Sequence, residues 1–156
     1  MSYLTQIGIK ENYMRKIYWA APLHDKSDQE RNNEYVEKLR ERGHKVYAPQ
    51  EHGIWEDLVK KYEKSEDAIR EHLYRLDLQA MKEADMCIAC CGDLKTPRGP
   101  SEGMLWEMGW MAAAHKNVIL FNENNYWRFN LMPQFGSTVF SNFDELLDYL
   151  DEEEFQ

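Results

Sequence analysis

The sequence contains few cysteines, and their spacing does not fit the usual disulfide or zinc patterns. Three of its 156 residues are cysteines, Cys87, Cys90 and Cys91, and all lie in one apolar run, residues 86–91. An odd, clustered set is not a disulfide framework, so we expect a reducing, cytoplasmic location. No second Cys or His pair follows at ligand spacing, and residues i and i+3 of a strand face opposite sides. We therefore interpret these thiols as buried strand residues and expect no metal site.

An excess of positive charge and a long apolar run are also missing. The formal net charge is −9. A nucleic-acid backbone or an anionic membrane as main partner would require a basic face, so both are disfavoured, whereas a small nucleoside in a pocket is compatible with this charge. No run is long and apolar enough to span a bilayer, and we expect no cleavable signal. Residues 1–14 are mixed in character and are interpreted as an N-terminal extension.

The common phosphate-binding fingerprints are absent from the sequence. Neither Gly-x-x-x-x-Gly-Lys-Ser/Thr nor Gly-x-Gly-x-x-Gly occurs, and the segment after the first expected strand, AAPLHD, is not rich in Ser, Thr and Gly. These absences disfavour nucleoside triphosphates, dinucleotides and FMN as ligands of the expected fold, and we expect no cofactor.

Short apolar runs alternate with segments of helical periodicity along the whole chain. The expected strands are residues 16–22, 44–49, 86–91, 117–121 and 137–141. The expected helices cover residues 27–43, two segments beginning at WEDLVKKY and SEDAIREH, residues 104–114 and residues 142–154. Such alternation implies parallel pairing with right-handed crossovers. We therefore predict a single α/β domain over residues 1–156, a flavodoxin-like doubly wound five-stranded sheet of order 2-1-3-4-5.

Local signals set the ends and faces of the expected helices. Ser27, with Glu30 three residues later, has the spacing of a capping box, and Gly43 is a natural C-terminal stop. In the later helix, Ile69, Leu73, Leu76, Ala80 and Met81 recur at helical spacing, which predicts an apolar stripe.

Glu107 is the first candidate catalytic group, because it follows the third expected strand and ligands of this fold bind beyond the carboxyl ends of the strands. Glu107 stands between Trp106 and Met108, in the first turn or so of the expected helix. There the helix dipole lowers the pKa of a carboxylate and apolar neighbours raise it, which can hold an ionised nucleophile in a poorly hydrated cleft. The alternative is a helix-start glutamate that only pairs with the dipole.

Asp77 is the second candidate, at the edge of the apolar stripe and one turn after Leu73. It is either a partly buried acid or an exposed residue paired with Arg70 or Arg75.

The order of several short motifs resembles the nucleoside 2-deoxyribosyltransferase family. The motifs are KIYWAAPLHD, LYRLDLQAMKEAD, SEGMLWEMGW and FNLM, and the resemblance runs from about Lys16 to the last helix. It implies a flavodoxin-like enzyme that cleaves the N-glycosidic bond of 2′-deoxynucleosides and transfers deoxyribose to another nucleobase without a cofactor. The implied partners are 2′-deoxynucleosides and free nucleobases, in nucleobase salvage.

The resemblance also implies roles for individual residues. Glu107 would be the nucleophile that attacks C1′, and Asp77 would protonate the departing base. Tyr18 would hydrogen-bond and orient Glu107. Asn130 would hold the sugar 5′-hydroxyl from a neighbouring subunit, which implies a homo-oligomer. The two-carboxylate chemistry agrees with retaining glycosyl transfer in general.

Further substrate-binding candidates follow from motif and loop positions. Many transferases carry an Asp six residues before the nucleophile, where this chain has Ser101, followed by Glu102. Either residue could contact the base, and a serine here also resembles the related 2′-deoxynucleoside 5′-monophosphate N-glycosidases, where it binds phosphate. His24 and Gln50 lie in loops expected to line the base pocket. The remaining candidates are Gly103 and Met132.

The sequence therefore leaves three functions open. The transferase is favoured because the loop after the first strand contains no arginine until Arg31 and because Asn130 suits a free 5′-hydroxyl. The monophosphate N-glycosidase is the first alternative. A non-catalytic nucleotide-sensing module on the same fold is the second.

Overall fold

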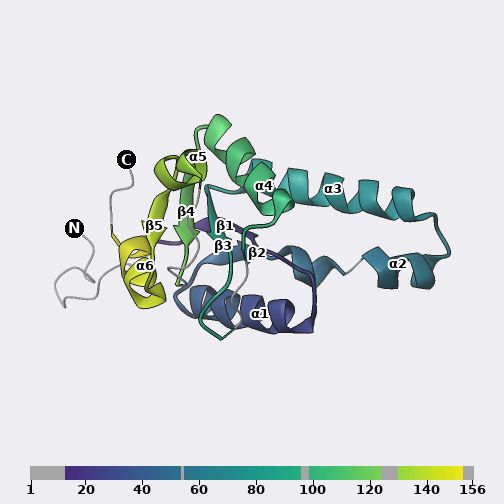
Figure 1. The fold of residues 1–156 in the computed structure, drawn as a ribbon, viewed down its shortest axis with the longest axis horizontal. Helices are drawn as coiled ribbons and strands as arrows, with labels where there is room; N and C mark the ends of the chain where they lie inside the picture. The colour runs from purple at the N-terminus through teal and green to yellow at the C-terminus, as the bar shows by residue number, and fades with distance from the viewer. Residues whose placement is uncertain (1–12, 54, 96–98, 124–129, 153–156) are drawn as a thin grey trace, which may run out of the picture.

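Five parallel strands form the centre of the protein in the order β2-β1-β3-β4-β5 (Figure 1). The structure is a computed structural model that describes residues 13–53, 55–95, 99–123 and 130–152. The strands are β1 (Lys16–Ala20), β2 (Lys45–Tyr47), β3 (Met86–Cys90), β4 (Asn117–Phe121) and β5 (Thr138–Phe140). The predicted flavodoxin-like order is confirmed, and the strand ends differ from the expected ranges by no more than two residues.

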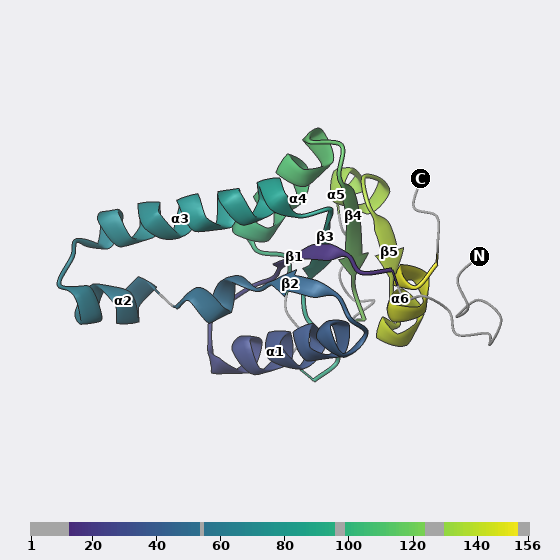
Figure 2. The ribbon, with the colours of Figure 1, turned by 180° about the vertical axis from the view of Figure 1, so that it is seen from behind.

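Helices cover both faces of the sheet, as Figures 1 and 2 show from opposite sides. They are α1 (Lys26–Glu41), the 3-10 helix η2 (Pro49–His52), α2 (Trp55–Tyr62), α3 (Glu66–Glu83), α4 (Glu102–Ala113), α5 (Leu131–Phe135) and α6 (Phe143–Leu150). Helices α1 and α6 pack on one face, and α3 and α4 pack on the other. No described helix is both long and apolar enough to cross a membrane.

Each face of the sheet has its own apolar cluster, because side chains alternate along every strand. On β1, Trp19 packs with α1 and α6, while Tyr18 packs with α3 and α4. On β3, Cys90 lies in the first cluster and Cys87 in the second, so the two thiols face opposite sides as predicted. All three cysteines are buried and free.

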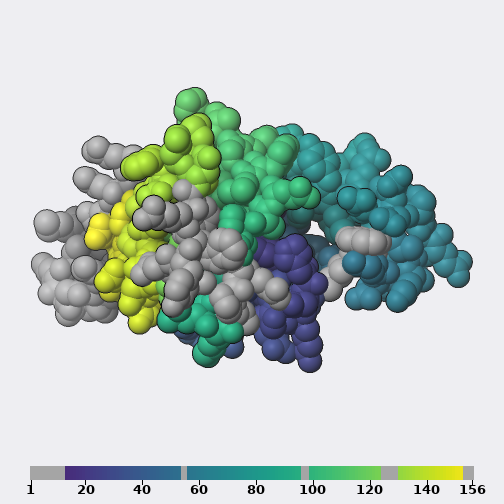
Figure 3. Space-filling model, in the orientation of Figure 1, coloured from purple at the N-terminus to yellow at the C-terminus, as the bar shows by residue number. Residues whose placement is uncertain are grey.

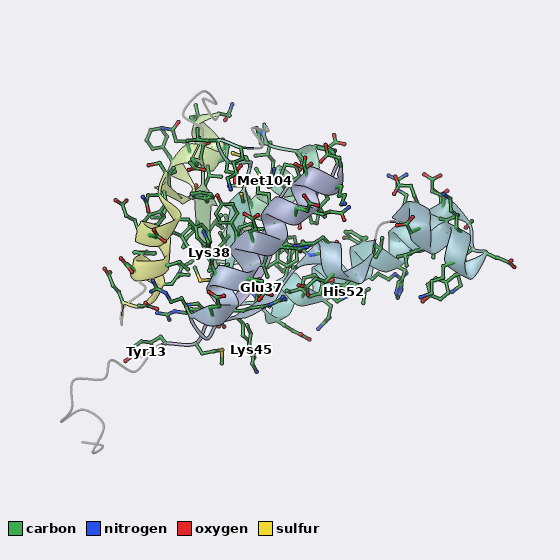
Figure 4. All side chains as sticks on the ribbon, turned by 90° about the horizontal axis from the view of Figure 1, so that it is seen from below. Tyr13, Glu37, Lys38, Lys45, His52 and Met104 are labelled. Carbon is green, nitrogen blue, oxygen red and sulfur yellow. The ribbon has the colours of Figure 1, made fainter. Side chains whose placement is uncertain are left out.

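The ends of α1 confirm one local prediction and correct another. The N-cap is Asp25, whose carboxylate accepts a hydrogen bond of 3.0 Å from the backbone N–H of Asp28, so the predicted Ser27 cap is wrong. The Ser27 hydroxyl instead donates to the Asp25 carboxylate at 2.7 Å. Gly43 follows the helix with φ of 91°, a conformation that suits glycine and ends the helix as expected. Figure 4 shows α1 from below, with Glu37 and Lys38 on it.

Helices α2 and α3 form a hairpin that projects from the sheet (Figures 1 and 3). The carboxyl-terminal part of α3 packs on the sheet and buries Ala80 and Met81, while Ile69 is buried within the hairpin region. Leu76 remains 36% exposed, so the predicted apolar stripe is wrong at this position. Leu76 lines an open cavity between α2 and α3, where Leu58 and Tyr62 cover it only in part.

Helix α4 begins two residues earlier than the sequence suggested. Ser101 is its N-cap and accepts a hydrogen bond of 3.2 Å from the backbone N–H of Met104. Glu107 is therefore in the second turn, not the first, and the helix dipole acts strongly only within the first turn. The last helix is also shorter than expected within the described residues, since α6 ends at Leu150.

Candidate active site

A cavity of about 540 Å³ lies between the start of α1 and the α2–α3 hairpin. Figure 3 shows the surface hollowed between the purple segment that leads into α1 and the teal hairpin. Its lining residues are Leu23, His24, Asp25, Lys26, Gln29, Pro49, Gln50, Gly53, Glu56, Asp57, Leu73 and Asp77. We call it the hairpin cavity. Carboxylates outnumber basic groups in its wall, so its surroundings favour neutral or cationic ligands over anions.

A second cavity, of about 690 Å³, lies between α3 and α4 and is called the helix groove. Its lining residues are Arg70, Leu73, Tyr74, Asp77, Met81, Gly103, Trp106 and Glu107. Their spacing in the sequence shows that one face of each helix lines the groove, since residues three and four apart are neighbours on a helix. Leu73 and Asp77 line both cavities, so the two spaces meet at these side chains.

The Glu107 carboxylate lies in a poorly hydrated place. Burial raises its pKa to about 7, with a smaller increase from the negative charge of Asp77, while the Tyr18 hydroxyl lowers it. The sequence had suggested a balance between burial and the helix dipole. Because Glu107 is in the second turn of α4, burial dominates instead, and the interpretation as a dipole-paired glutamate at the helix start is wrong.

Tyr18 lies at the centre of the sheet and is fully buried. Its hydroxyl is close enough to Glu107 for each group to shift the pKa of the other. Within the described part of the chain, however, the Tyr18 hydroxyl and Glu107 Oε2 both lack a hydrogen bond of normal geometry. Buried polar atoms left in this state are costly, which is typical of a site that is completed by a ligand.

Asp77 is held by Tyr47, a residue that the sequence analysis missed. The Tyr47 hydroxyl donates to Asp77 Oδ1 at 2.9 Å, and its ring stacks on Tyr18 on one side and His52 on the other, with centroids 5.6 and 4.5 Å apart. Burial raises the pKa of Asp77, while the Tyr47 hydrogen bond and the nearby imidazole of His52 lower it. In Figure 4, His52 lies where the chain leads towards the hairpin.

The sequence does contain a signal for Tyr47. Strands β1 and β2 read Lys-Ile-Tyr and Lys-Val-Tyr, and the sheet pairs Tyr18 with Tyr47 directly. Aligning the two strands would have placed both tyrosines on the same face. The predicted ion-pair alternative for Asp77 is not what the structure shows, because Arg70 pairs with Glu66 and Arg75 pairs with Glu71.

His24 and Gln50 both line the hairpin cavity with Asp77. Gln50 donates from Nε2 to Asn33 at 3.2 Å, and its Oε1 is buried without a hydrogen-bond partner among the described residues. This oxygen is an acceptor available to a ligand of the hairpin cavity. His24 is exposed, and its backbone N–H donates to Asp28 at 2.9 Å.

Ser101, Glu102 and Gly103 stand at the start of α4, but only Gly103 is among the residues that line the helix groove. A Cβ atom at Gly103 would meet nothing within 4 Å, so glycine leaves space open there. Ser101 accepts from the backbone as the N-cap, and Glu102 is exposed.

Asn130 and Met132 lie on the other side of α4. With Leu105, Met108 and neighbouring residues they line a third cavity of about 470 Å³ between α4 and α5. Asn130 is exposed, and its side chain accepts a hydrogen bond of 3.0 Å from the backbone of Met132 as the N-cap of α5. Within one chain, therefore, the structure brings Tyr18, Asp77 and Glu107 together and leaves Asn130 apart from them.

In the described ranges, no group of three or more His, Cys, Asp and Glu side chains is arranged to hold a metal ion. The groups of the site that can take part in a reaction are thus two partly buried carboxylates, with tyrosine hydroxyls beside them. A fold of this topology with such a pair at the carboxyl ends of the strands is suited to a group-transfer or hydrolytic enzyme that acts through carboxylates.

Comparison with known proteins identifies the family. A family model described as nucleoside 2-deoxyribosyltransferase matches residues 17–146. The chain belongs to the nucleoside 2-deoxyribosyltransferase family. This confirms the resemblance noted in the sequence. No protein with a curated description matches the chain.

Solved structures confirm the fold. A 2-deoxyribosyltransferase from the psychrotolerant bacterium Bacillus psychrosaccharolyticus aligns with a TM-score of 0.68 and 22% identity, covering 90% of this chain and 98% of that one. A conserved protein from Enterococcus faecalis aligns with a TM-score of 0.69 and 18% identity, and the alignment covers 88% of this chain and 98% of that one. A CMP N-glycosidase from Clostridium botulinum aligns with a TM-score of 0.50 and 24% identity, and the alignment covers 87% of this chain and 98% of that one.

Replacing Glu107 with Gln is expected to stabilise the protein at high pH. The pKa of Glu107 is about 7 in the folded protein and close to the ordinary 4.5 when unfolded. As the pH rises between these values, the folded state retains a proton that the unfolded state has lost, so the wild type loses stability. Glu107→Gln removes this loss, and its unfolding free energy at pH 8 should exceed that of the wild type by up to about 3 kcal/mol.

Urea denaturation of both proteins at pH 5 and pH 8 measures this effect, with the exposed Glu102→Gln on the same helix as control. A gain from Glu107→Gln of equal size at both pH values would contradict the assigned cause.

Tyr47→Phe is expected to raise the pKa of Asp77, because the substitution removes a hydrogen bond that favours the ionised carboxylate and keeps the stacked ring. An NMR titration of the Asp77 carboxyl carbon measures the shift. Tyr35→Phe is a matched control, since the Tyr35 hydroxyl donates to a different carboxylate, Asp93, at 3.0 Å. An unchanged or lower pKa of Asp77 in Tyr47→Phe would refute the role of Tyr47.

Proposed function

We propose that the protein is a nucleoside 2-deoxyribosyltransferase that cleaves the N-glycosidic bond of 2′-deoxynucleosides and passes deoxyribose to another base through an ester on Glu107. The observation that carries the proposal is the position of Asp77. Its side chain lines both the hairpin cavity and the helix groove, whereas Glu107 lines the groove. A base in the hairpin cavity and a sugar in the groove would place the glycosidic bond next to Asp77.

In the first half-reaction, a Glu107 carboxylate oxygen attacks C1′ as the C1′–N bond breaks, and the Asp77 carboxyl gives its proton to the departing base. The productive state has Glu107 ionised and Asp77 protonated. Burial raises the pKa of both groups. The Tyr18 hydroxyl favours the ionised form of Glu107.

In the second half-reaction, a nitrogen of the incoming base attacks C1′, and the ester bond to Glu107 breaks. The N–H proton of that base passes to the Asp77 carboxylate, which restores the starting state. A 2-deoxy sugar forms an oxocarbenium-like centre readily because no 2′-hydroxyl withdraws electrons. Proton delivery to the leaving group is then the main demand on the site.

The walls of the hairpin cavity suit the uncharged base of a nucleoside. Asp25, Glu56, Asp57 and Asp77 surround this space, and Lys26 is the neighbouring cation, itself 3.6 Å from Glu30. The unpaired Gln50 Oε1 can accept a hydrogen bond from an amino or imino group of a base. The predicted role in cytoplasmic nucleobase salvage rests on this substrate class.

A 5′-monophosphate N-glycosidase is the second candidate, and it is favoured by Ser101. This residue is the N-cap of α4, and a helix N-terminus attracts a phosphate group. The Ser101 hydroxyl accepts from Met104 and can still donate to a ligand. The same carboxylate chemistry would then end with water instead of a second base.

Incubation with a deoxynucleoside and a second free base separates these functions. A new deoxynucleoside supports transfer, and base release from the 5′-monophosphate alone supports the glycosidase. Binding without turnover would indicate a sensor. Glu107→Ala should abolish base exchange, and Asp77→Asn should slow it by ~10²–10⁴-fold, the usual contribution of a general acid. Exposed Glu71→Gln on α3 is the control, and near-normal exchange by Glu107→Ala would refute the nucleophile.

Within one chain Asn130 lines a different cavity from Asp77 and Glu107, and we propose that it binds the sugar 5′-hydroxyl in the site of a neighbouring copy. Mixing Glu107→Gln with Asn130→Ala, each inactive or nearly so alone, should form mixed oligomers in which some sites are intact. Recovery of exchange activity on mixing measures this effect. If the mixture stays as inactive as its components while mixed oligomers form, Asn130 acts within its own chain or not at all.

A further inference from the structure

We propose that Tyr74 and Trp106 form an aromatic wall over the helix groove that keeps water from the sugar on Glu107 and so directs the reaction to transfer instead of hydrolysis. This inference rests on the proposed function, because it concerns the fate of the ester intermediate. It assigns a role to two residues that the two-carboxylate chemistry does not use.

The two rings stand beside the two reacting carboxylates. Tyr74 is three residues before Asp77 on α3, on the same helical face, and Trp106 immediately precedes Glu107 on α4. Both side chains line the groove, and their rings meet edge to face across it, with centroids 6.2 Å apart and planes inclined by 66°. The pair therefore links the two helices on either side of the groove.

Both rings are half exposed and lie outside the apolar clusters of the sheet. Tyr74 is 50% exposed and Trp106 is 51% exposed, and neither ring belongs to the apolar clusters that hold the described helices on the sheet. Leu73 and Met81 continue the apolar side of the groove. Large apolar surface facing a groove that also contains a reacting carboxylate is typical of a wall that contacts a ligand.

The chemistry of the intermediate gives this wall a function. The ester between Glu107 and C1′ can react with either of two nucleophiles, and the same bond to Glu107 breaks in both reactions. A base nitrogen attacks C1′, or a water oxygen attacks it, and in both cases the proton goes to Asp77 and the Glu107 carboxylate is released. The sugar ring of a 2-deoxynucleoside presents its C2′ methylene, an apolar surface that can pack on aromatic rings. Rings packed there would cover C1′ on the side of the groove and exclude water.

The experiment measures the ratio of new deoxynucleoside to free deoxyribose, with a deoxynucleoside donor and a second base at fixed concentrations. We expect Trp106→Ala and Tyr74→Ala to lower this ratio about tenfold while release of the first base continues. Trp106→Phe and Tyr74→Phe keep an aromatic ring and should stay near the wild-type ratio. Tyr62→Ala is the matched control, since Tyr62 on α2 is a 53% exposed aromatic outside the groove.

Each outcome decides the proposal. A lower ratio in both Ala variants, kept in both Phe variants and in Tyr62→Ala, supports the wall. An unchanged ratio, or an equal fall in Tyr62→Ala, overturns it while leaving the transferase intact. Trp106→Gln and Tyr74→Gln, polar substitutions at half-exposed positions, answer the same question if an Ala variant does not fold. A wild type that releases base but never transfers would instead refute the proposed function itself.

Discussion

The packing of α4 on the sheet is the constraint on which the site depends. Met104, Met108 and Met111 enter the apolar cluster on this face, and their helical spacing fixes the rotation of α4. With that rotation set, Glu107 must point towards Tyr18 and the groove, where burial raises its pKa to about 7. A buried carboxylate is unfavourable for folding, and it is held there because the methionine side chains on the same helix gain more by leaving water.

The tyrosines of β1 and β2 extend this arrangement to the second carboxylate. Parallel register places Tyr18 beside Tyr47, and the stack continues to His52. Tyr47 uses its hydroxyl on Asp77, whereas the Tyr18 hydroxyl and Glu107 Oε2 stay unpaired among the described residues. The Asp77 side of the site is thus organised in the free protein. The Glu107 side, which would form the bond to the sugar in the proposed mechanism, keeps buried polar atoms without a hydrogen bond, at a cost in stability.

Helix α4 also separates two sets of functional residues. Gly103, Trp106 and Glu107 line the groove towards α3, while Leu105 and Met108 line the cavity towards α5 that includes Asn130. Large apolar side chains remain exposed around α5 and β5, among them Met132, Phe135 and Val139. Both facts are compatible with a neighbouring copy that completes the site, as the family resemblance implies.

The order of the sheet, the alternation of strands and helices, and the position of Glu107 after the third strand could be predicted from the sequence, because alternation and loop positions are local patterns. Local rules were less reliable where two side chains compete for one role. Asp25 and Ser27 can both accept a hydrogen bond from a backbone N–H, but only Asp25 lies before the first turn of α1, and it is the N-cap. Only the tertiary structure decided that Tyr47 holds Asp77, that burial and not the helix dipole governs the pKa of Glu107, and that Asn130 lies apart. Each of these depends on which distant side chains surround a group, and that environment exists only after the strands pair and α4 packs on them.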